Sequence, residues 1–255
     1  MSINDLKPTQ EDQTERLPLV GFLSVIKPVG PSSMKAVAMV RKRAGSARTG
    51  HAGTLDPLAS GVLVMGLGKA TRLLQDVMTT DKSYRTIIDL SAFTKTDDRE
   101  GDLEHVSVLS PPSRGAIEDA LRSFRGEFMQ RPPQFSAVKI NGVRAYKKAR
   151  RSQHVAPDPR PVFVHKLKIL AYSWPTVQLE LTCRKGFYVR SLARDLGIAL
   201  STGGHCADIV RTAVGPFTEA LSVPLEKVPN PIVHTDLISI ERWQSLLQAY
   251  SAELS

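Results

Sequence analysis

Gly50-His51-Ala52-Gly53-Thr54-Leu55-Asp56-Pro57-Leu58-Ala59-Ser60-Gly61 is the stretch around which the chain is organised, and an apolar run over residues 62–65 follows it directly. Its three glycines permit backbone angles and close approaches that other residues resist. Its single carboxylate, Asp56, precedes a proline. By the ordinary rules of capping, such an Asp-Pro pair begins a helix, with the aspartate as N-cap.

The charge around Asp56 argues against that ordinary interpretation. Residues 17–55 carry six Lys or Arg and no acidic residue, so Asp56 is the first carboxylate after a long basic segment. Cationic surroundings keep a carboxylate ionised and attract polyanions. We therefore interpret residues 50–61 as a functional loop with Asp56 at its centre.

Composition predicts a globular protein with a polyanionic partner. The 255 residues are 42% hydrophobic and 23% charged, which is enough to bury a core, and the net charge is +9. Residues 131–160 contain eight Lys or Arg against Asp158 alone, whereas residues 219–255 contain five acidic and two basic residues. The 131–160 block is thus the strongest candidate for an electrostatic contact with nucleic acid.

Several function classes are excluded. The two cysteines form no Cys-x-x-Cys and the six histidines have no metal-ligand spacing, so we expect no metal site. Cys206 follows His205, but adjacent residues seldom face each other, and a core position is favoured. The segment 66–71 lacks the first glycine of a nucleotide-binding loop, since Leu63 occupies that position. Without a signal peptide or a long apolar run, we expect a cytoplasmic protein in a reducing compartment.

The pattern of elements predicts an α+β fold with hairpins and few βαβ units. Strands are expected at 21–26, 62–67, 84–92, 162–171 and 177–183, the last two paired. Helices are expected after Ser32 or Ser33, over 70–78, after Ser113, from about 189, and over 238–253. Asn141-Gly142 indicates a hairpin turn. We divide the chain into a disordered leader (1–18), a main domain (19–222) and a short tail with one helix (223–255).

One residue breaks a local rule. Arg190 is expected in the first turn of the helix near 189, where the helix dipole disfavours a cation. A residue that breaks a local rule without local gain is a candidate for function.

Five segments together resemble the TruB family of tRNA pseudouridine synthases. The family pattern G-H-x-G-T-L-D-P-x-A-x-G-x-L is filled at every fixed position from residue 50 to 63. K-P-x-G-x-[TS]-S is matched at 27–33, and Q-x-P-P-x-F-S-A-x-K-x-x-G-x-x-A-Y-x-x-A-R at 130–150. C-x-K-G-T-Y-[IV]-R is matched at 183–190 with Phe187 for Thr, and K-x-Y-x-[AV] at 82–86 with Thr86 at its last position. The resemblance covers roughly residues 20–220, without the PUA-type domain that many members add.

The resemblance implies a fold and an activity. The expected fold is a mixed, largely antiparallel central sheet with flanking helices and an RNA-gripping insertion at 131–160. The implied reaction is isomerisation of uridine at position 55, in the T loop of tRNA, to pseudouridine after the base is flipped from its stack. Because the implied reaction is a redox-neutral rearrangement, we expect neither a metal nor a cofactor. We expect the T-arm stem-loop as partner, no membrane and a monomer.

The resemblance also implies roles for individual residues. Asp56 would be the nucleophile, Arg190 would pair with it, and Tyr84 would stack on the uracil. His51 would help place the flipped nucleotide, Tyr188 would border it, and Lys27 would support the loop. Contacts to the RNA backbone are expected from Lys139, Arg144, Lys147, Lys148, Arg150 and Arg151.

Two alternatives stay open. An RNA-binding folding factor would help tRNA without turnover, although it would have no use for Asp56 paired with Arg190. The second alternative is the same chemistry on a different RNA, and it stays open because the PUA-type domain is missing.

Overall fold

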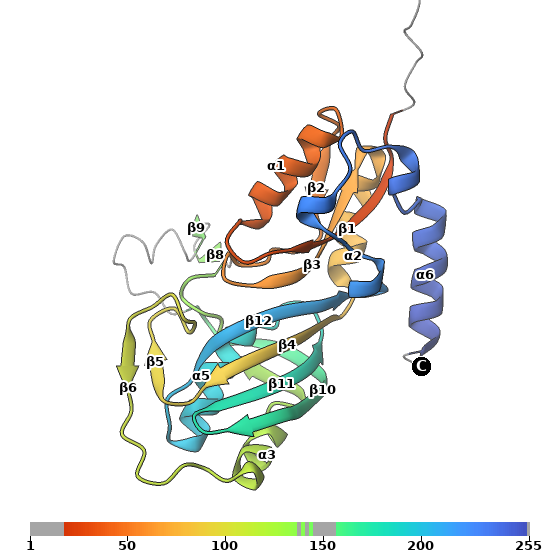
Figure 1. Cartoon of the computed structure of the whole chain (residues 1–255). Helices are drawn as coiled ribbons and strands as arrows, with labels where there is room; N and C mark the ends of the chain where they lie inside the picture. Colours follow the sequence, from red (N-terminus) through yellow and green to blue (C-terminus); the bar gives the residue numbers. More distant parts are fainter. Residues whose placement is uncertain (1–17, 137–138, 141–142, 145–156, 254–255) are drawn as a thin grey trace, which may run out of the picture.

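The computed structural model describes residues 18–136, 139–140, 143–144 and 157–253. Its main feature is a ten-stranded mixed sheet flanked by helices (Figure 1). Most neighbouring strands are antiparallel, so the predicted α+β class with a largely antiparallel sheet is confirmed.

The strands are β1 (Gly21–Lys27), β2 (Thr49–His51), β3 (Ser60–Leu67), β4 (Lys82–Asp89), β5 (Ala92–Thr94), β6 (Leu103–His105), β7 (Gly126–Gln130), β8 (Lys139–Ile140), β9 (Val143–Arg144), β10 (Arg160–Ser173), β11 (Thr176–Cys183), β12 (His205–Val214), β13 (Phe217–Thr218) and β14 (Val223–Pro224). The α-helices are α1 (Ser33–Arg43), α2 (Leu74–Thr79), α3 (Arg114–Arg122), α5 (Val189–Leu200) and α6 (Ile240–Glu253). Short 3₁₀ segments are η1 (Gly68–Leu73), η2 (Glu219–Leu221), η3 (Leu225–Lys227) and η4 (His234–Asp236).

The order of the strands brings distant parts of the chain together. The main sheet runs β14-β1-β3-β12-β4-β11-β10-β7, with β2 paired to β3 and β13 to β12. The β1–β14 and β3–β12 pairs are parallel. Because β12 lies between β3 and β4, Arg211 is paired with Gly61 on one side and with Tyr84 on the other. The end of the 50–61 loop thus lies beside Tyr84.

Burial follows the strand patterns in the sequence. In β11 the side chains at 177, 179, 181 and 183 are buried and those between them are partly exposed, which confirms the predicted alternation. The strand β3 is instead buried from Gly61 to Leu67, as expected of a strand covered on both faces. The paired strands predicted near 162–171 and 177–183 are β10 and β11.

Helices bury apolar stripes on the sheet. Leu192 and Leu196 of α5 and Ile117 and Leu121 of α3 are fully buried in the main core. Burial of each such side chain contributes roughly 1.5–3 kcal/mol. Ser32 caps α1 and Ser113 caps α3, each by accepting from the backbone N–H three residues later. The cap at Ser113 was predicted, and Ser32 was one of the two residues predicted to cap α1.

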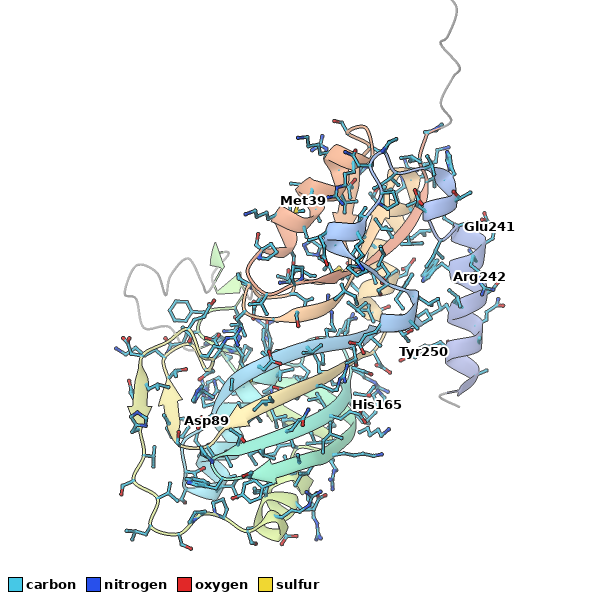
Figure 2. All side chains as sticks on the ribbon, in the orientation of Figure 1. Met39, Asp89, His165, Glu241, Arg242 and Tyr250 are labelled. Carbon is cyan, nitrogen blue, oxygen red and sulfur yellow. The ribbon has the colours of Figure 1, made fainter. Side chains whose placement is uncertain are left out.

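The C-terminal segment packs on β1. Phe22 and Ile238 exchange two backbone hydrogen bonds of 2.8 Å, and the Trp243 ring lies 5.1 Å from the Phe22 ring between centroids. Glu241 and Arg242 of α6, labelled in Figure 2, are exposed. The predicted terminal helix therefore exists, beginning two residues later than expected, and it completes a second apolar cluster around Phe22.

Two elements differ from their predictions. The helix expected over 70–78 begins as the 3₁₀ segment η1, in which Thr71 Oγ1 donates to the Gly68 carbonyl, and only then becomes α2. The strand expected over 84–92 stops at Asp89, whose carboxylate accepts from the backbone and hydroxyl of Ser91 and forms a turn. Across the described ranges, no helix is long and apolar enough to span a membrane.

Candidate active site

A cavity of about 320 Å³ opens beside Asp56. Its walls come from the 53–59 loop, β4, the 183–190 segment and β12. Four of the residues singled out by sequence lie on this wall, namely Asp56, Tyr84, Tyr188 and Arg190. The structure thus brings together side chains that are up to 134 positions apart in the chain.

The loop around Asp56 is a turn, so the ordinary helix-start interpretation is wrong. Ala59 N–H donates to the Asp56 carbonyl, and extended strand β3 begins at Ser60. Gly61 has a φ of +104°, and a Cβ at that position would lie 2.2 Å from the Arg211 carbonyl oxygen. Only glycine allows β12 to approach so closely. Because no helix follows Asp56, its carboxylate has no N-cap bonds to make and remains 40% exposed.

The loop is held from behind by the start of α1. Ser33 Oγ donates to the Leu55 carbonyl and accepts from the Leu55 N–H, at 2.9 and 2.8 Å. Gly30 N–H donates to the Pro57 carbonyl at 2.8 Å. These bonds fix the backbone on both sides of Asp56, so its carboxylate is held at the cavity by a rigid support.

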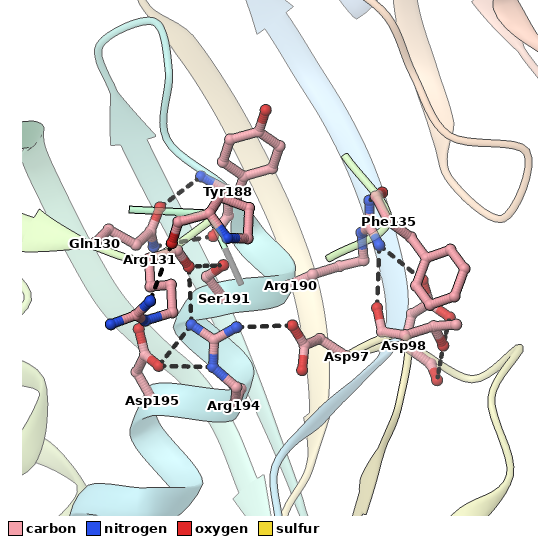
Figure 3. Close-up of polar contacts among 12 residues, drawn as sticks. Asp97, Asp98, Gln130, Arg131, Phe135, Tyr188, Arg190, Ser191, Arg194 and Asp195 are labelled. Atoms are coloured by element: carbon pink, nitrogen blue, oxygen red, sulfur yellow. Dashed lines mark hydrogen bonds and ion pairs between the residues drawn. The ribbon is translucent and has the colours of Figure 1, made fainter. Parts of the chain in front are cut away.

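Arg190 pairs with Asp56. Its Nη2 lies 2.9 Å from Asp56 Oδ2, and its side chain is only 6% exposed. The same guanidinium donates to the Thr96 carbonyl at 3.0 Å and to the Phe135 carbonyl at 3.0 Å, the second among the contacts drawn in Figure 3. The expected contact is confirmed, and these bonds compensate for the unfavourable place of a cation in the first turn of α5.

A second carboxylate lies behind Arg190. Asp98 Oδ2 is 3.4 Å from Arg190 Nη1, and Asp98 Oδ1 accepts from Thr96 Oγ1 and the Glu100 N–H. The Asp98 side chain is 3% exposed, against 40% for Asp56. Arg190 therefore joins a buried carboxylate, held by its own loop, to one that faces the cavity.

One turn further along α5, a second pair repeats this arrangement. Arg194 Nη1 lies 2.9 Å from Asp97 Oδ2, as Figure 3 shows. Asp97 adopts a left-handed φ of +59°. With this backbone turn, Asp97 contacts Arg194 and the next residue, Asp98, contacts Arg190. Burial raises the pKa of Asp97 to about 6, against the opposing effect of Arg194.

Helix α5 also holds the strand that leads into the 131–160 segment. Ser191 Oγ and Arg194 Nη2 both donate to the Arg131 carbonyl, at 2.8 and 2.9 Å. Gln130 exchanges two hydrogen bonds with the backbone of Tyr188 (Figure 3). The Phe135 carbonyl reaches Arg190 itself. The basic segment is thus anchored to the helix that carries the partner of Asp56.

The basic segment itself is described in part. Strands β8 and β9 pair antiparallel, with Lys139 opposite Arg144, which confirms the hairpin predicted from Asn141-Gly142. The remaining expected contacts to an RNA backbone, Lys147, Lys148, Arg150 and Arg151, lie outside the described residues.

Arg211 forms the floor of the cavity beside Tyr84. Its Nε donates to the Val62 carbonyl at 2.8 Å, and its two Nη atoms donate to Thr54 and Gly53 carbonyls at 3.3 and 3.2 Å. Only 2% of the residue is exposed. Burial raises the pKa of Tyr84 to about 12, with a smaller opposing effect from the neighbouring Arg211.

Two expected substrate residues lie behind the wall rather than on it. Lys27 is fully buried and its Nζ donates to the Pro28 and Pro31 carbonyls, so it holds the 28–31 turn, and its support of the Asp56 loop stays a prediction. Burial lowers its pKa to about 8, and the charge of Asp56 partly offsets this. His51, on β2, is not among the residues that line the cavity, and burial lowers its pKa.

Four residues of the site had no role assigned from sequence. Asp98 contacts Arg190, and Arg211 holds the backbone carbonyls described above. Ser136, Lys82 and Arg211 line the cavity. For the three charged residues, the only signal in the sequence was their charge within a strand or turn. That signal is weak, because a charged residue usually marks a solvated surface. Within the described ranges, no group of three His, Cys, Asp or Glu side chains is arranged to hold a metal ion.

Comparison with known proteins assigns most of the chain to two family models. Residues 41–189 match the N-terminal domain of the TruB family of pseudouridylate synthases. Residues 190–243 match the tRNA pseudouridylate synthase B C-terminal domain. The similarity thus extends to residue 243, and the expectation that it ends near 220 is wrong. The added residues include Ile238 and Trp243, which pack on Phe22.

Individual relatives agree with these models. The chain is 42% identical over 227 residues to tRNA pseudouridine synthase B of Corynebacterium diphtheriae, covering 85% of this chain and 75% of the relative. It is 46% identical over 209 residues to the protein of the same name from Ruegeria pomeroyi, covering 82% and 69%.

Two solved structures share the fold. One is a Cbf5–Nop10–Gar1 complex, with a TM-score of 0.64 and 31% identity over 82% of this chain. The other is an H/ACA RNP bound to a substrate RNA containing 2′-deoxyuridine, with a TM-score of 0.62, 27% identity and the same coverage. The matched region is about half of each of those chains, 53% and 52%. This chain belongs to the TruB family of pseudouridylate synthases.

Proposed function

We propose that this protein isomerises uridine at position 55, in the T loop of tRNA, to pseudouridine, and that Asp56 is the nucleophile. Relatives named tRNA pseudouridine synthase B, 42% and 46% identical over most of the chain, support tRNA as the substrate. A substrate RNA occupies one of the related structures, which supports RNA as the ligand of this fold. The net charge of +9 supports a polyanionic partner.

The pairing of Asp56 with Arg190 at the cavity carries this proposal. Arg190 is buried and held by two carbonyls and Asp98, whereas Asp56 is 40% exposed. A charge-assisted contact of this kind orients a carboxylate. The free oxygen of Asp56 is then available for attack on a nucleotide in the cavity.

The cavity suits a flipped nucleotide. Its volume of about 320 Å³ is at the small end of ligand sites. An enzyme that acts on a base inside folded RNA removes it from its stack and binds it in a closed pocket, at a cost of a few kcal/mol. Tyr84 offers an aromatic face for stacking, worth roughly 1–3 kcal/mol per base. Tyr188, just before α5, would border the base, and His51, on β2, would help place the flipped nucleotide.

The chemistry is a rearrangement in which the carbon–nitrogen glycosidic bond breaks and a carbon–carbon bond forms at carbon 5. Asp56 can add to the sugar carbon 1′ or to the uracil ring. In both cases the proton on carbon 5 leaves and the ring nitrogen gains one, so the reaction is redox-neutral.

The direct test is position-specific mapping of pseudouridine. Purified protein is incubated with unmodified tRNA, with its isolated T-arm hairpin, and with both RNAs carrying cytidine at position 55. We expect one pseudouridine per uridine RNA, at position 55, and none in the cytidine RNAs. Tight binding without conversion would instead favour the RNA-folding factor, and modification elsewhere would refute the proposed target.

A further inference from the structure

The floor of the cavity holds two buried cations that have no carboxylate partner. Arg211 is 2% exposed and Lys82 is 7% exposed, and both line the cavity. Within the described residues, neither forms an ion pair at 4.0 Å or less. Buried charges are normally paired, because removing an ion from water is costly. A protein that keeps two unpaired cations at one cavity has a site suited to negative charge.

Backbone carbonyls hold these cations in place without neutralising them. Arg211 donates to the carbonyls of Gly53, Thr54 and Val62, and Lys82 donates to those of Met78 and Thr80. Carbonyl dipoles solvate a cation but carry no net charge. The effect of burial is visible in Lys82, whose pKa burial lowers to about 8, with a further lowering by Arg211. The two cations are therefore close enough to act on the same region of the cavity.

The register of the sheet aims both cations at the expected position of the base. Lys82 and Tyr84 are two residues apart on β4 and so lie on the same face. Arg211 is the direct partner of Tyr84 on β12, and directly opposed residues share a face. The ring expected to stack on the uracil thus has one cation two residues before it on its own strand and a second on the neighbouring strand.

Negative charge develops on the uracil by either route of the proposed reaction. If Asp56 attacks carbon 1′, the electron pair of the breaking bond passes to ring nitrogen 1 and is shared with the carbonyl at carbon 2. If Asp56 adds to carbon 6, the electron pair of the carbon 5–carbon 6 double bond passes to the carbonyl at carbon 4. Fixed charges aimed at such an anion lower the barrier without reorganisation.

We propose that Arg211 and Lys82 form a cationic floor that stabilises the uracil anion during this isomerisation. The inference rests on the proposed function and adds to it the groups that accept the developing charge. Asp56 and Arg190 generate the intermediate, and the cationic floor stabilises it.

The test compares two T-arm hairpins, with uridine or 5-fluorouridine at the target position. Fluorine withdraws electrons, so the fluorinated ring forms its anion more easily and needs less help from the protein. Single-turnover rate constants for loss of the parent nucleoside give a ratio, 5-fluorouridine over uridine, for each variant. Any defect in folding or in the Asp56 loop slows both RNAs and cancels in the ratio.

We expect Arg211→Met to raise this ratio about tenfold over wild type, equivalent to about 1.4 kcal/mol of lost stabilisation. Arg211→Lys, which keeps the charge, should stay near the wild-type ratio. The matched control is Arg43→Met, which removes a guanidinium that donates to the Leu225 and Val228 carbonyls away from the cavity. It should leave the ratio unchanged.

An Arg211→Met ratio within threefold of wild type overturns the proposal. If circular dichroism shows that this variant is unfolded, Lys82→Met decides by the same threshold. The proposed function fails separately, by absence of pseudouridine from the uridine hairpin with wild-type protein. A wild type that converts uridine, with an unchanged variant ratio, refutes the cationic floor alone.

Discussion

At the scale of single residues, Arg190 makes the contacts on which the geometry of the site depends most. Its planar guanidinium contacts Asp56, Asp98 and two backbone carbonyls at once. A lysine ammonium is a point charge and cannot reproduce these directions. We therefore predict that Arg190→Lys lowers kcat by about a hundredfold, about 2.7 kcal/mol.

The matched control for this prediction lies on the same helix. Arg194→Lys changes the pair with Asp97, one turn away, and leaves Asp56 untouched. It should lose far less activity in the same single-turnover assay on the T-arm hairpin. Near-normal activity of Arg190→Lys would show that the contact with Asp56 has no part in the chemistry.

The variant Tyr84→Phe tests whether Tyr84 acts only by stacking on the base or also through its hydroxyl. Removing the hydroxyl in Tyr84→Phe keeps the aromatic face, so RNA affinity should be unchanged. The rate constant should fall, because the hydroxyl lies at the cavity beside Arg211. Tyr172→Phe is the control, since its hydroxyl donates to the Pro112 carbonyl away from the cavity. An unchanged rate would reduce Tyr84 to a stacking surface.

At the scale of elements, the loop after β5 and helix α5 act as one unit. Asp97 has a pKa of about 6 in the folded protein, raised by burial, against an ordinary value near 3.8. Between these values the folded state binds more protons than the unfolded state, so stability falls as pH rises through this window. Asparagine tolerates the left-handed backbone at this position.

We predict that Asp97→Asn removes this part of the pH dependence. When the pH rises from 4 to 7, the unfolding free energy of the wild type should fall. This fall should exceed that of the variant by on the order of 2 kcal/mol. Denaturant unfolding of both proteins at both pH values measures the difference. Parallel changes with pH in the two proteins would contradict the burial of an ionisable Asp97.

Local sequence patterns predicted the elements better than the contacts between them. The alternation in β11, the caps of α1 and α3 and the pairing of β8 with β9 depend on residues close in sequence, and they formed as expected. Arg190 was found because it breaks a helix rule. Arg211 breaks no local rule, and its burial depends on a loop some 150 residues earlier in the chain, so no local signal could assign it.

At the scale of the whole molecule, affinity for RNA should rest on the basic segment. Each lost phosphate contact reduces the slope of log affinity against log salt by roughly 0.7–0.9. We predict that neutralising Lys147, Lys148, Arg150 and Arg151 together weakens tRNA binding and flattens this slope. Binding is measured by filter retention from low to high salt.

The control removes the same charge from four exposed positions that do not line the cavity. These are Arg122, Lys166, Lys168 and Arg242. If both variants lose the same slope, the net charge of +9 and not the 131–160 segment determines binding.

The most direct measurement is single-turnover formation of pseudouridine by Asp56→Asn on the T-arm hairpin, with RNA affinity measured in parallel. The amide keeps the shape of the side chain and loses the nucleophile. Each 1.4 kcal/mol or so of lost barrier stabilisation costs about tenfold in rate. The account predicts affinity within a few-fold of wild type and no detectable pseudouridine. Pseudouridine formation by the pure variant at a measurable rate would contradict the assignment of Asp56 as nucleophile.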